Sequence, residues 1–111
     1  MILAALGEDL NMARSNHVAG FDIQSTGGMR GFQMTFENGY TVSVQFGVSN
    51  YCENRDYKPD AEKSEIGASP SAEIAAWDQT GKWVSFEHDD VKGWCKPDEV
   101  AAFITKIASL K

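Results

Sequence analysis

The fold of this chain is decided by residues 31–46, GFQMTFENGYTVSVQF, in which two alternating arms flank a turn. Alternation of apolar and polar side chains is typical of half-buried strands, so this stretch predicts a β-hairpin. A two-residue loop would mix apolar and polar side chains on each face, whereas a three-residue loop places Met34 opposite Val42 and separates them. We therefore expect a loop over 37–39, in which Gly39 adopts the left-handed conformation that closes such a turn.

A second hairpin is predicted over residues 73–86, EIAAWDQTGKWVSF. With the same loop length, Ile74 faces Phe86 on the side of the core. Trp77 and Trp83 then lie side by side on the other face. Two neighbouring tryptophans need a cover, so we expect a helix, a partner or a ligand over them.

The segments after the hairpins complete the predicted fold. Residues 91–94 are expected to form a fifth strand that pairs with the strand over 82–86. Pro97 opens a helix with acidic side chains in its first turn and an apolar stripe that packs on the sheet. The stripe consists of Val100, Phe103, Ile104, Ile107 and Leu110. The expected fold class is α+β: an antiparallel sheet of about five strands, two hairpins plus one strand, with a C-terminal helix.

A chain of 111 residues and 12.2 kDa has room for one core and one domain. We place this single α+β domain at residues 21–111. Residues 1–20 carry a weak helical stripe and form either an N-terminal extension or a second helix. The stripe consists of Ile2, Leu3, Leu6 and Leu10. The polar stretch 51–71 has no pattern, and both a binding lid and a mobile linker fit it.

The net charge of −6, from 16 acidic residues against 10 lysines and arginines, argues against direct nucleic-acid binding, which needs clustered basic residues. No apolar run has the roughly 18 residues of a membrane span, and the first residues do not resemble a signal peptide, so we expect a cytoplasmic protein. Cys52 and Cys95 are expected to be reduced and packed. Together with His17 and His88 they form no metal-ligand spacing, so no metal is expected.

Catalysis is not expected either. The only grouping of a titrating base with carboxylates is His88 beside Asp89 and Asp90, and adjacent residues of a strand point to opposite faces. The sequence has no phosphate-binding glycine motif and no glycine-flanked nucleophile turn. We therefore expect a protein that is not an enzyme and that uses no cofactor.

Four stretches of the sequence carry a resemblance to a known group of proteins. They are residues 30–47 (RGFQMTFENGYTVSVQFG), 50–55 (NYCENR), 72–78 (AEIAAWD) and 93–100 (GWCKPDEV). In these stretches the chain resembles small uncharacterised proteins encoded by tailed bacteriophages. The resemblance covers most of residues 30–105 and implies a phage or prophage origin and expression in the host bacterial cytoplasm. The chain departs from the pattern at Lys96, where a Ser or Thr would cap the helix better.

Among phage proteins, the anti-Thoeris sponge proteins are comparable in size and in element order, an antiparallel sheet followed by a C-terminal helix. They assemble as oligomers and sequester cyclic ADP-ribose-type or cyclic oligonucleotide signals. The comparison implies a non-enzymatic anti-defence protein that binds a nucleotide-type second messenger. No motif of that class is matched residue by residue, so no site residue is carried over.

A nucleotide site is predicted instead from residue chemistry. An anionic ligand that carries a base needs a guanidinium group for its phosphate and an aromatic ring for its base. The candidate ligand-binding residues are Arg30, Asn50, Tyr51, Asn54, Arg55 and Phe86. Trp83 and Trp94 are further stacking candidates, and for Phe86 and Trp94 the alternative is a place in the core.

The alternative function is an acidic protein inhibitor of a nucleic-acid-handling bacterial defence complex, comparable to an anti-CRISPR protein. Charge complementarity permits an acidic surface to occupy the basic groove of such a complex. The surface would comprise Glu87, Asp89, Asp90 and the loop 53–65.

Assembly as a homo-oligomer is expected because one C-terminal helix cannot cover both faces of a sheet. The Trp77 and Trp83 pair would remain exposed in a monomer. We expect a two-fold dimer that buries this pair or the exposed edge of the sheet. The alternative is that the N-terminal segment folds back and covers the tryptophans within one chain.

Overall fold

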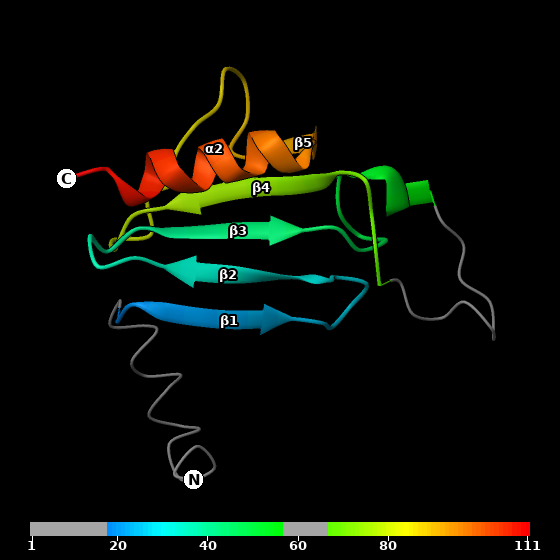
Figure 1. Cartoon of the computed structure of the whole chain (residues 1–111), viewed down its shortest axis with the longest axis horizontal. Helices are drawn as coiled ribbons and strands as arrows, with labels where there is room; N and C mark the ends of the chain where they lie inside the picture. The colour runs from blue at the N-terminus through cyan, green and yellow to red at the C-terminus, as the bar shows by residue number, and fades with distance from the viewer. Residues whose placement is uncertain (1–17, 57–66) are drawn as a thin grey trace, which may run out of the picture.

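The computed structural model describes residues 18–56 and 67–111 and has an α+β architecture. Its strands are β1 (Gly20–Gln24), β2 (Gly31–Thr35), β3 (Thr41–Gln45), β4 (Ala72–Trp77) and β5 (Lys92–Cys95), and its helices are the short 3-10 helix η1 (Glu53–Asp56) and α2 (Pro97–Ala108). The strands form one antiparallel sheet in the order β1-β2-β3-β4-β5. Figure 1 shows α2 lying across one face of this sheet. The prediction of a five-stranded antiparallel sheet with a C-terminal helix is thus confirmed.

The β2–β3 hairpin has the predicted register. Met34 lies opposite Val42, and the Phe36 N–H donates a 2.8 Å hydrogen bond to the Tyr40 carbonyl oxygen across the three-residue loop. Gly39 has a φ of 89°, the left-handed conformation that this loop requires. The separation of apolar from polar side chains was therefore sufficient to determine the pairing.

The core lies between α2 and the face of the sheet formed by β3 and β4, the two strands that α2 contacts most closely. Phe103 and Ile107 are four residues apart on α2, so both lie on the side of the helix that faces the sheet. Burial of an aliphatic or aromatic side chain in such a core contributes about 1.5–3 kcal/mol. The buried cluster consists of Val42, Val44, Ala72, Ile74, Ala76, Cys95, Phe103 and Ile107.

The first strand, β1, was not predicted. It pairs with β2 along all five of its residues and forms one edge of the sheet. Gly27 and Gly28 lie in the turn between β1 and β2 and have φ values of 61° and 82°. The alternative second helix in the N-terminal region falls on residues 1–17, which lie outside the described residues.

The second predicted hairpin forms only at its closed end. The Asp78 N–H donates a 2.8 Å hydrogen bond to the Lys82 carbonyl oxygen, and Trp77 pairs with Trp83 across the turn. Beyond Val84 the chain leaves the sheet, and it turns where the Phe86 N–H donates to the Asp89 carbonyl oxygen at 2.7 Å.

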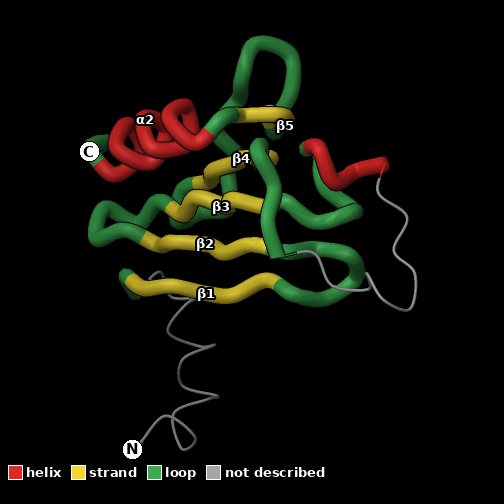
Figure 2. Tube along the Cα trace, turned by 45° about the vertical axis from the view of Figure 1, so that its right-hand side comes forward, coloured by secondary structure: helices red, strands yellow, loops and turns green. Residues whose placement is uncertain are grey.

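The strand that continues beside β4 is β5, which places Lys92 opposite Ile74. The predictions that Phe86 faces Ile74 and that the fifth strand pairs with residues 82–86 are therefore wrong. Instead, β5 takes the place beside β4, and the Phe86 ring packs against Phe103 of α2, with ring centroids 5.5 Å apart. Residues 85–91 form a loop that stands away from the sheet, as Figure 2 shows.

Both ends of α2 are fixed by side chains. At the start, the Lys96 N–H donates a 3.0 Å hydrogen bond to Oε1 of Glu99, which offsets the missing Ser or Thr cap. At the end, Nδ2 of Asn38 donates to the carbonyl oxygens of Ile107 and Leu110, at 2.9 and 2.8 Å. A side chain of the β2–β3 turn thereby caps the C-terminal end of α2.

Candidate functional site

Three exposed side chains gather beside β5 and form what we call the aromatic platform: Tyr51, Arg55 and Trp94. The rings of Tyr51 and Trp94 are stacked, with centroids 5.9 Å apart and an interplanar angle of 17°. The guanidinium carbon of Arg55 lies 5.1 Å from the centroid of the Tyr51 ring. Tyr51 is 41% exposed and Trp94 is 47% exposed, so both rings keep much of their surface free for a ligand.

The loop that carries Tyr51 is fastened to the sheet by polar contacts. Asn50 is buried; its Oδ1 accepts a 2.8 Å hydrogen bond from the Gly47 N–H. Its Nδ2 donates to Oε1 of Glu73 on β4 at 3.2 Å, and Oε2 of the same carboxylate accepts from the Tyr51 N–H at 3.4 Å. The position of the Tyr51 ring is therefore well defined, because the backbone at Tyr51 is anchored to β4.

Trp94 faces outward because its backbone is in the left-handed region, with a φ of 51°. It is the one residue other than glycine in the described part of the chain with a positive φ. The Trp94 N–H donates a 2.8 Å hydrogen bond to the Tyr51 carbonyl oxygen, which ties the two residues together through their backbones. This conformation costs roughly 1–2 kcal/mol for a bulky residue, and such strain is concentrated at functional sites.

Gly93 permits this arrangement. A Cβ atom at position 93 would lie 2.6 Å from Cβ of Tyr51, so only glycine fits there without displacing the tyrosine. The alternative that Trp94 lies in the core is wrong, because Trp94 is an exposed side chain. The signal in the sequence was the Gly93-Trp94 pair within a short strand, since a glycine in a strand often marks a bulge or a close approach.

Of the six predicted ligand-binding residues, the structure brings Tyr51 and Arg55 together. Asn50 and Asn54 are engaged within the fold; Nδ2 of Asn54 donates to the carbonyl oxygens of Phe46 and Ala68, at 2.7 and 3.1 Å. Arg30 lies at the start of β2, where Nη1 donates to the carbonyl oxygens of Ser25 and Met29. Phe86 packs against α2 at the margin of the core. Sequence reasoning did not place Trp94 among these six.

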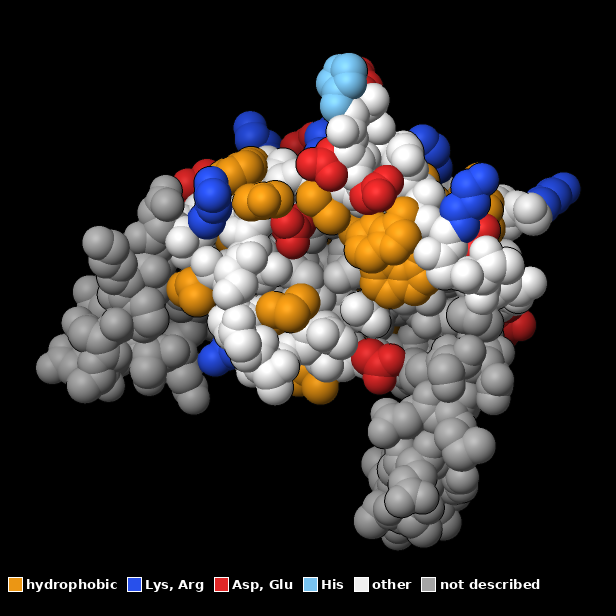
Figure 3. Space-filling view, turned by 180° about the vertical axis from the view of Figure 1, so that it is seen from behind, with side chains coloured by type: hydrophobic (Ala, Val, Ile, Leu, Met, Phe, Trp, Pro, Cys, Tyr) orange, Lys and Arg blue, Asp and Glu red, His pale blue; other side chains and the backbone are white. Residues whose placement is uncertain are grey.

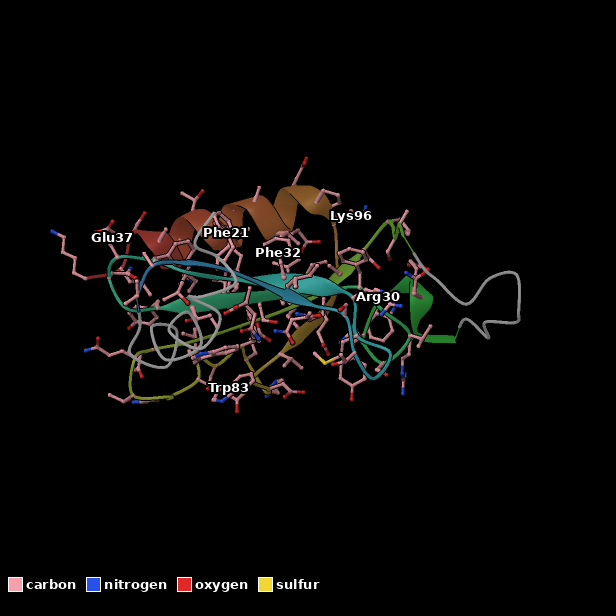
Figure 4. The ribbon with its side chains drawn as sticks, turned by 90° about the horizontal axis from the view of Figure 1, so that it is seen from below. Phe21, Arg30, Phe32, Glu37, Trp83 and Lys96 are labelled. Atoms are coloured by element: carbon pink, nitrogen blue, oxygen red, sulfur yellow. The ribbon has the colours of Figure 1, made fainter. Side chains whose placement is uncertain are left out.

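The predicted interface residues Trp77 and Trp83 are neighbours. Their ring centroids are 5.0 Å apart at an angle of 45°, and Trp83 is 44% exposed. Figure 4 places Trp83 on the face of the sheet opposite α2, and Figure 3, which looks at that face, shows an apolar patch. Burial of this patch in an oligomer stays a prediction.

The loop 85–91 carries three acidic side chains and no lysine or arginine. Glu87, Asp89 and Asp90 are all exposed, and Oδ1 of Asp90 accepts a 3.1 Å hydrogen bond from the Ser85 hydroxyl. Figure 3 shows acidic side chains gathered on and around the projection at the top of the molecule. This arrangement leaves the carboxylates open to an approaching partner.

Cys52 and Cys95 are both free and buried, and burial raises the pKa of the Cys95 thiol, with a further contribution from Glu99. Within residues 18–56 and 67–111, no group of three or more His, Cys, Asp and Glu side chains is placed to hold a metal ion. The helices in this part of the chain are too short or too polar to span a bilayer. Comparisons with protein-family models, curated proteins and solved structures found no match.

Proposed function

We propose that this protein is a non-enzymatic, phage-encoded anti-defence protein that binds and sequesters a nucleotide-type second messenger, either cyclic ADP-ribose or a cyclic oligonucleotide. The observation that carries the proposal is the aromatic platform, with two stacked and exposed rings beside a guanidinium group. The phage origin and the anti-defence role rest on the sequence resemblance. The proposed ligand class rests on the side chains of the aromatic platform.

The platform offers both interactions that a nucleotide needs. A base can stack on the exposed ring of Trp94 or Tyr51, and base stacking on an aromatic side chain contributes about 1–3 kcal/mol per base. Arg55 lies next to the rings, where its guanidinium can donate paired hydrogen bonds to a phosphate. The base and the phosphate of one ligand would therefore be bound side by side.

The charge of the protein limits which ligand is favoured. A net charge of −6 repels anions at long range, and the loop 85–91 adds to this repulsion near the sheet. Binding must then depend on stacking and on short-range contacts with Arg55 more than on electrostatic attraction. Small cyclic nucleotides with one or two negative charges fit this balance better than long oligonucleotides.

Calorimetry against cyclic ADP-ribose isomers and cyclic di- and trinucleotides tests the proposal. We expect one of these ligands to bind, and the Trp94→Ala and Arg55→Gln variants to bind it at least tenfold more weakly, since each loses one of the two contacts. Trp83→Ala, which removes an exposed tryptophan outside the platform, is the matched control and should bind normally. The absence of binding to any of these ligands at high protein concentration would exclude the proposal.

A second candidate function is supported by the projecting loop 85–91, whose carboxylates are exposed. In this alternative, the loop occupies the basic groove of a nucleic-acid-handling defence complex. Reversal of charge at Asp89 and Asp90, to lysine, should abolish co-purification of that complex from infected host lysate. Unchanged co-purification, or a nucleotide released from the boiled protein, would favour the first proposal.

A further inference from the structure

One carboxylate beside the aromatic platform accepts only long hydrogen bonds. Glu73 lies on β4 between Ala72 and Ile74, which belong to the core, so its side chain leaves the sheet on the face opposite α2. There Oε1 accepts from Nδ2 of Asn50 at 3.2 Å, and Oε2 accepts from the Tyr51 N–H at 3.4 Å. Hydrogen bonds from an N–H to an ionised acceptor are usually about 2.7–2.9 Å long. Both contacts to Glu73 are therefore weak.

The neighbours of Glu73 do not complete its hydrogen bonds. Gln45 lies opposite Glu73 on β3, but its Nε2 donates to the Ser43 hydroxyl oxygen at 3.1 Å. No lysine or arginine within residues 18–56 and 67–111 forms an ion pair with Glu73. A carboxylate can accept about four hydrogen bonds, two on each oxygen. Because Glu73 is only half-buried, each of its oxygens keeps an acceptor position open to a ligand.

The carboxylate is also held in a defined position. Asn50, which donates to Oε1, is 3% exposed, and its own Oδ1 accepts a 2.8 Å hydrogen bond from the Gly47 N–H. Glu73 itself belongs to a strand that is paired on both sides. A group fixed in this way loses little conformational freedom when a ligand binds to it.

Two neighbouring acceptors match a ligand edge that carries two neighbouring donors. Guanine is the common nucleobase with such an edge, because its N1–H and its 2-amino group lie side by side. Adenine and cytosine present one donor next to a ring-nitrogen acceptor, and uracil presents one N–H between two carbonyl oxygens. An acceptor of the base that faces a carboxylate is repelled and leaves a carboxylate oxygen unpaired, which costs affinity.

We infer that Glu73 makes the aromatic platform selective for guanine. This inference rests on the proposed function and narrows its ligand to a cyclic nucleotide that contains guanine. The base stacks on an exposed ring of the platform while its N1–H and 2-amino group donate to the two oxygens of Glu73. Glu73 contacts the backbone end of Tyr51, and Arg55 lies 5.1 Å from the ring centroid of the same residue. The base edge and the phosphate are thus bound by different side chains around one tyrosine.

Calorimetry of the full chain against two matched probes, cyclic di-GMP and cyclic di-AMP, tests the inference. The probes have the same backbone and the same charge and differ only in the base. We expect cyclic di-GMP to bind at least about tenfold more tightly. Cyclic di-IMP has the N1–H but lacks the 2-amino group, so its affinity should fall between the other two. This third probe tests the contact without any change to the protein.

Glu73→Gln distinguishes base recognition from a purely structural role. The amide offers one acceptor and one donor, which suits adenine better than guanine. We expect the preference for cyclic di-GMP over cyclic di-AMP to fall at least about tenfold, whereas a structural loss alone would weaken both ligands equally. Glu53→Gln removes the same charge from an exposed side chain near Tyr51 and should leave the preference unchanged.

The results that overturn the inference differ from those that exclude the proposed function. Equal affinity for cyclic di-GMP and either other probe would overturn the inference alone. So would an unchanged preference in a Glu73→Gln variant that is folded by circular dichroism. Binding of cyclic ADP-ribose and of neither cyclic di-GMP nor cyclic di-IMP would also overturn it and retain the proposed function. The absence of binding to every nucleotide would exclude both.

Discussion

Gly93 determines whether the aromatic platform can exist, because it lies directly against Tyr51. We predict that Gly93→Ala displaces Tyr51 and lowers the free energy of unfolding by about 1–3 kcal/mol, the usual cost of an added methyl group in a tight contact. Near-ultraviolet circular dichroism should show loss of the Tyr51–Trp94 stacking signal, and denaturant unfolding gives the stability. Gly67→Ala is the control, since no atom lies within 4 Å of the added Cβ. Equal stability of the two variants would contradict the packing seen here.

Asn38 joins the β2–β3 turn to the end of α2 through hydrogen bonds from its side-chain amide. We predict that Asn38→Ala lowers the free energy of unfolding by about 1–3 kcal/mol, because helix carbonyl groups lose their donor. Asn38→Asp should be worse, since it places a carboxylate at the negative end of the helix dipole. Thermal or urea unfolding measures both. Glu37→Ala, an exposed change in the same turn, should alter stability by less than about 0.5 kcal/mol, and a similar loss there would contradict the capping role.

The start of α2 introduces a dependence of stability on pH. The hydrogen bond from the Lys96 N–H, and to a smaller extent the nearby Lys92 charge, hold the pKa of Glu99 below its ordinary value of 4.5. Because the pKa is lower in the folded state, ionised Glu99 stabilises the fold above pH 4.5, and this stabilisation is lost as the pH falls through the folded-state pKa. We predict that Glu99→Gln flattens the acid limb of the stability profile measured by urea unfolding.

Lys92→Met separates the two causes of this shift. Lys92 lies 3.5 Å from Oε2 of Glu99 across exposed surface, where ion pairs contribute little. This variant should therefore keep most of the acid dependence, because the helix-start hydrogen bond is retained. An acid limb for Glu99→Gln that runs parallel to that of the unmodified protein would show that the capping contact does not affect stability.

At the level of strands, some strand pairings could be predicted from the alternation of apolar and polar residues and others could not. The β2–β3 hairpin followed from alternation alone, because a single register separates its two faces. β1 has the same alternation, with Phe21 and Ile23 on one face, but only two apolar residues carry it, and its partner lies across the Gly27-Gly28 turn. Residues 82–86 show the reverse case: they alternate well, yet the chain leaves the sheet after Val84 and the Phe86 ring packs on α2.

The platform was predictable in its chemistry and not in its geometry. Tyr51 and Arg55 were selected because they offer a ring and a guanidinium group close together in sequence. The outward position of Trp94 depends on a φ of 51°, which no hydrophobic pattern specifies for a tryptophan. The contact between residues 51 and 94 also joins a loop to a strand far along the chain, and sequence periodicity contains no information about such a pairing.

Over the whole molecule, the two thiols report on global unfolding. Cys52 and Cys95 are each 1% exposed, and burial raises the pKa of the Cys95 thiol, so little reactive thiolate is present in the folded state. We predict that iodoacetamide modifies both cysteines at one common rate, which increases with urea in parallel with unfolding. Mass spectrometry of partly labelled protein measures this. Rapid modification of one cysteine alone would reveal a local opening instead.

The strand order β1-β2-β3-β4-β5 has a consequence for synthesis on the ribosome. Each strand can pair with the one made just before it, so the sheet can grow while the chain emerges. The helix that shields Val42, Val44 and Ile74 follows all five strands, however. The nascent sheet therefore presents a bare apolar surface until α2 leaves the exit tunnel, and during that interval it is a natural client for a chaperone and vulnerable to aggregation.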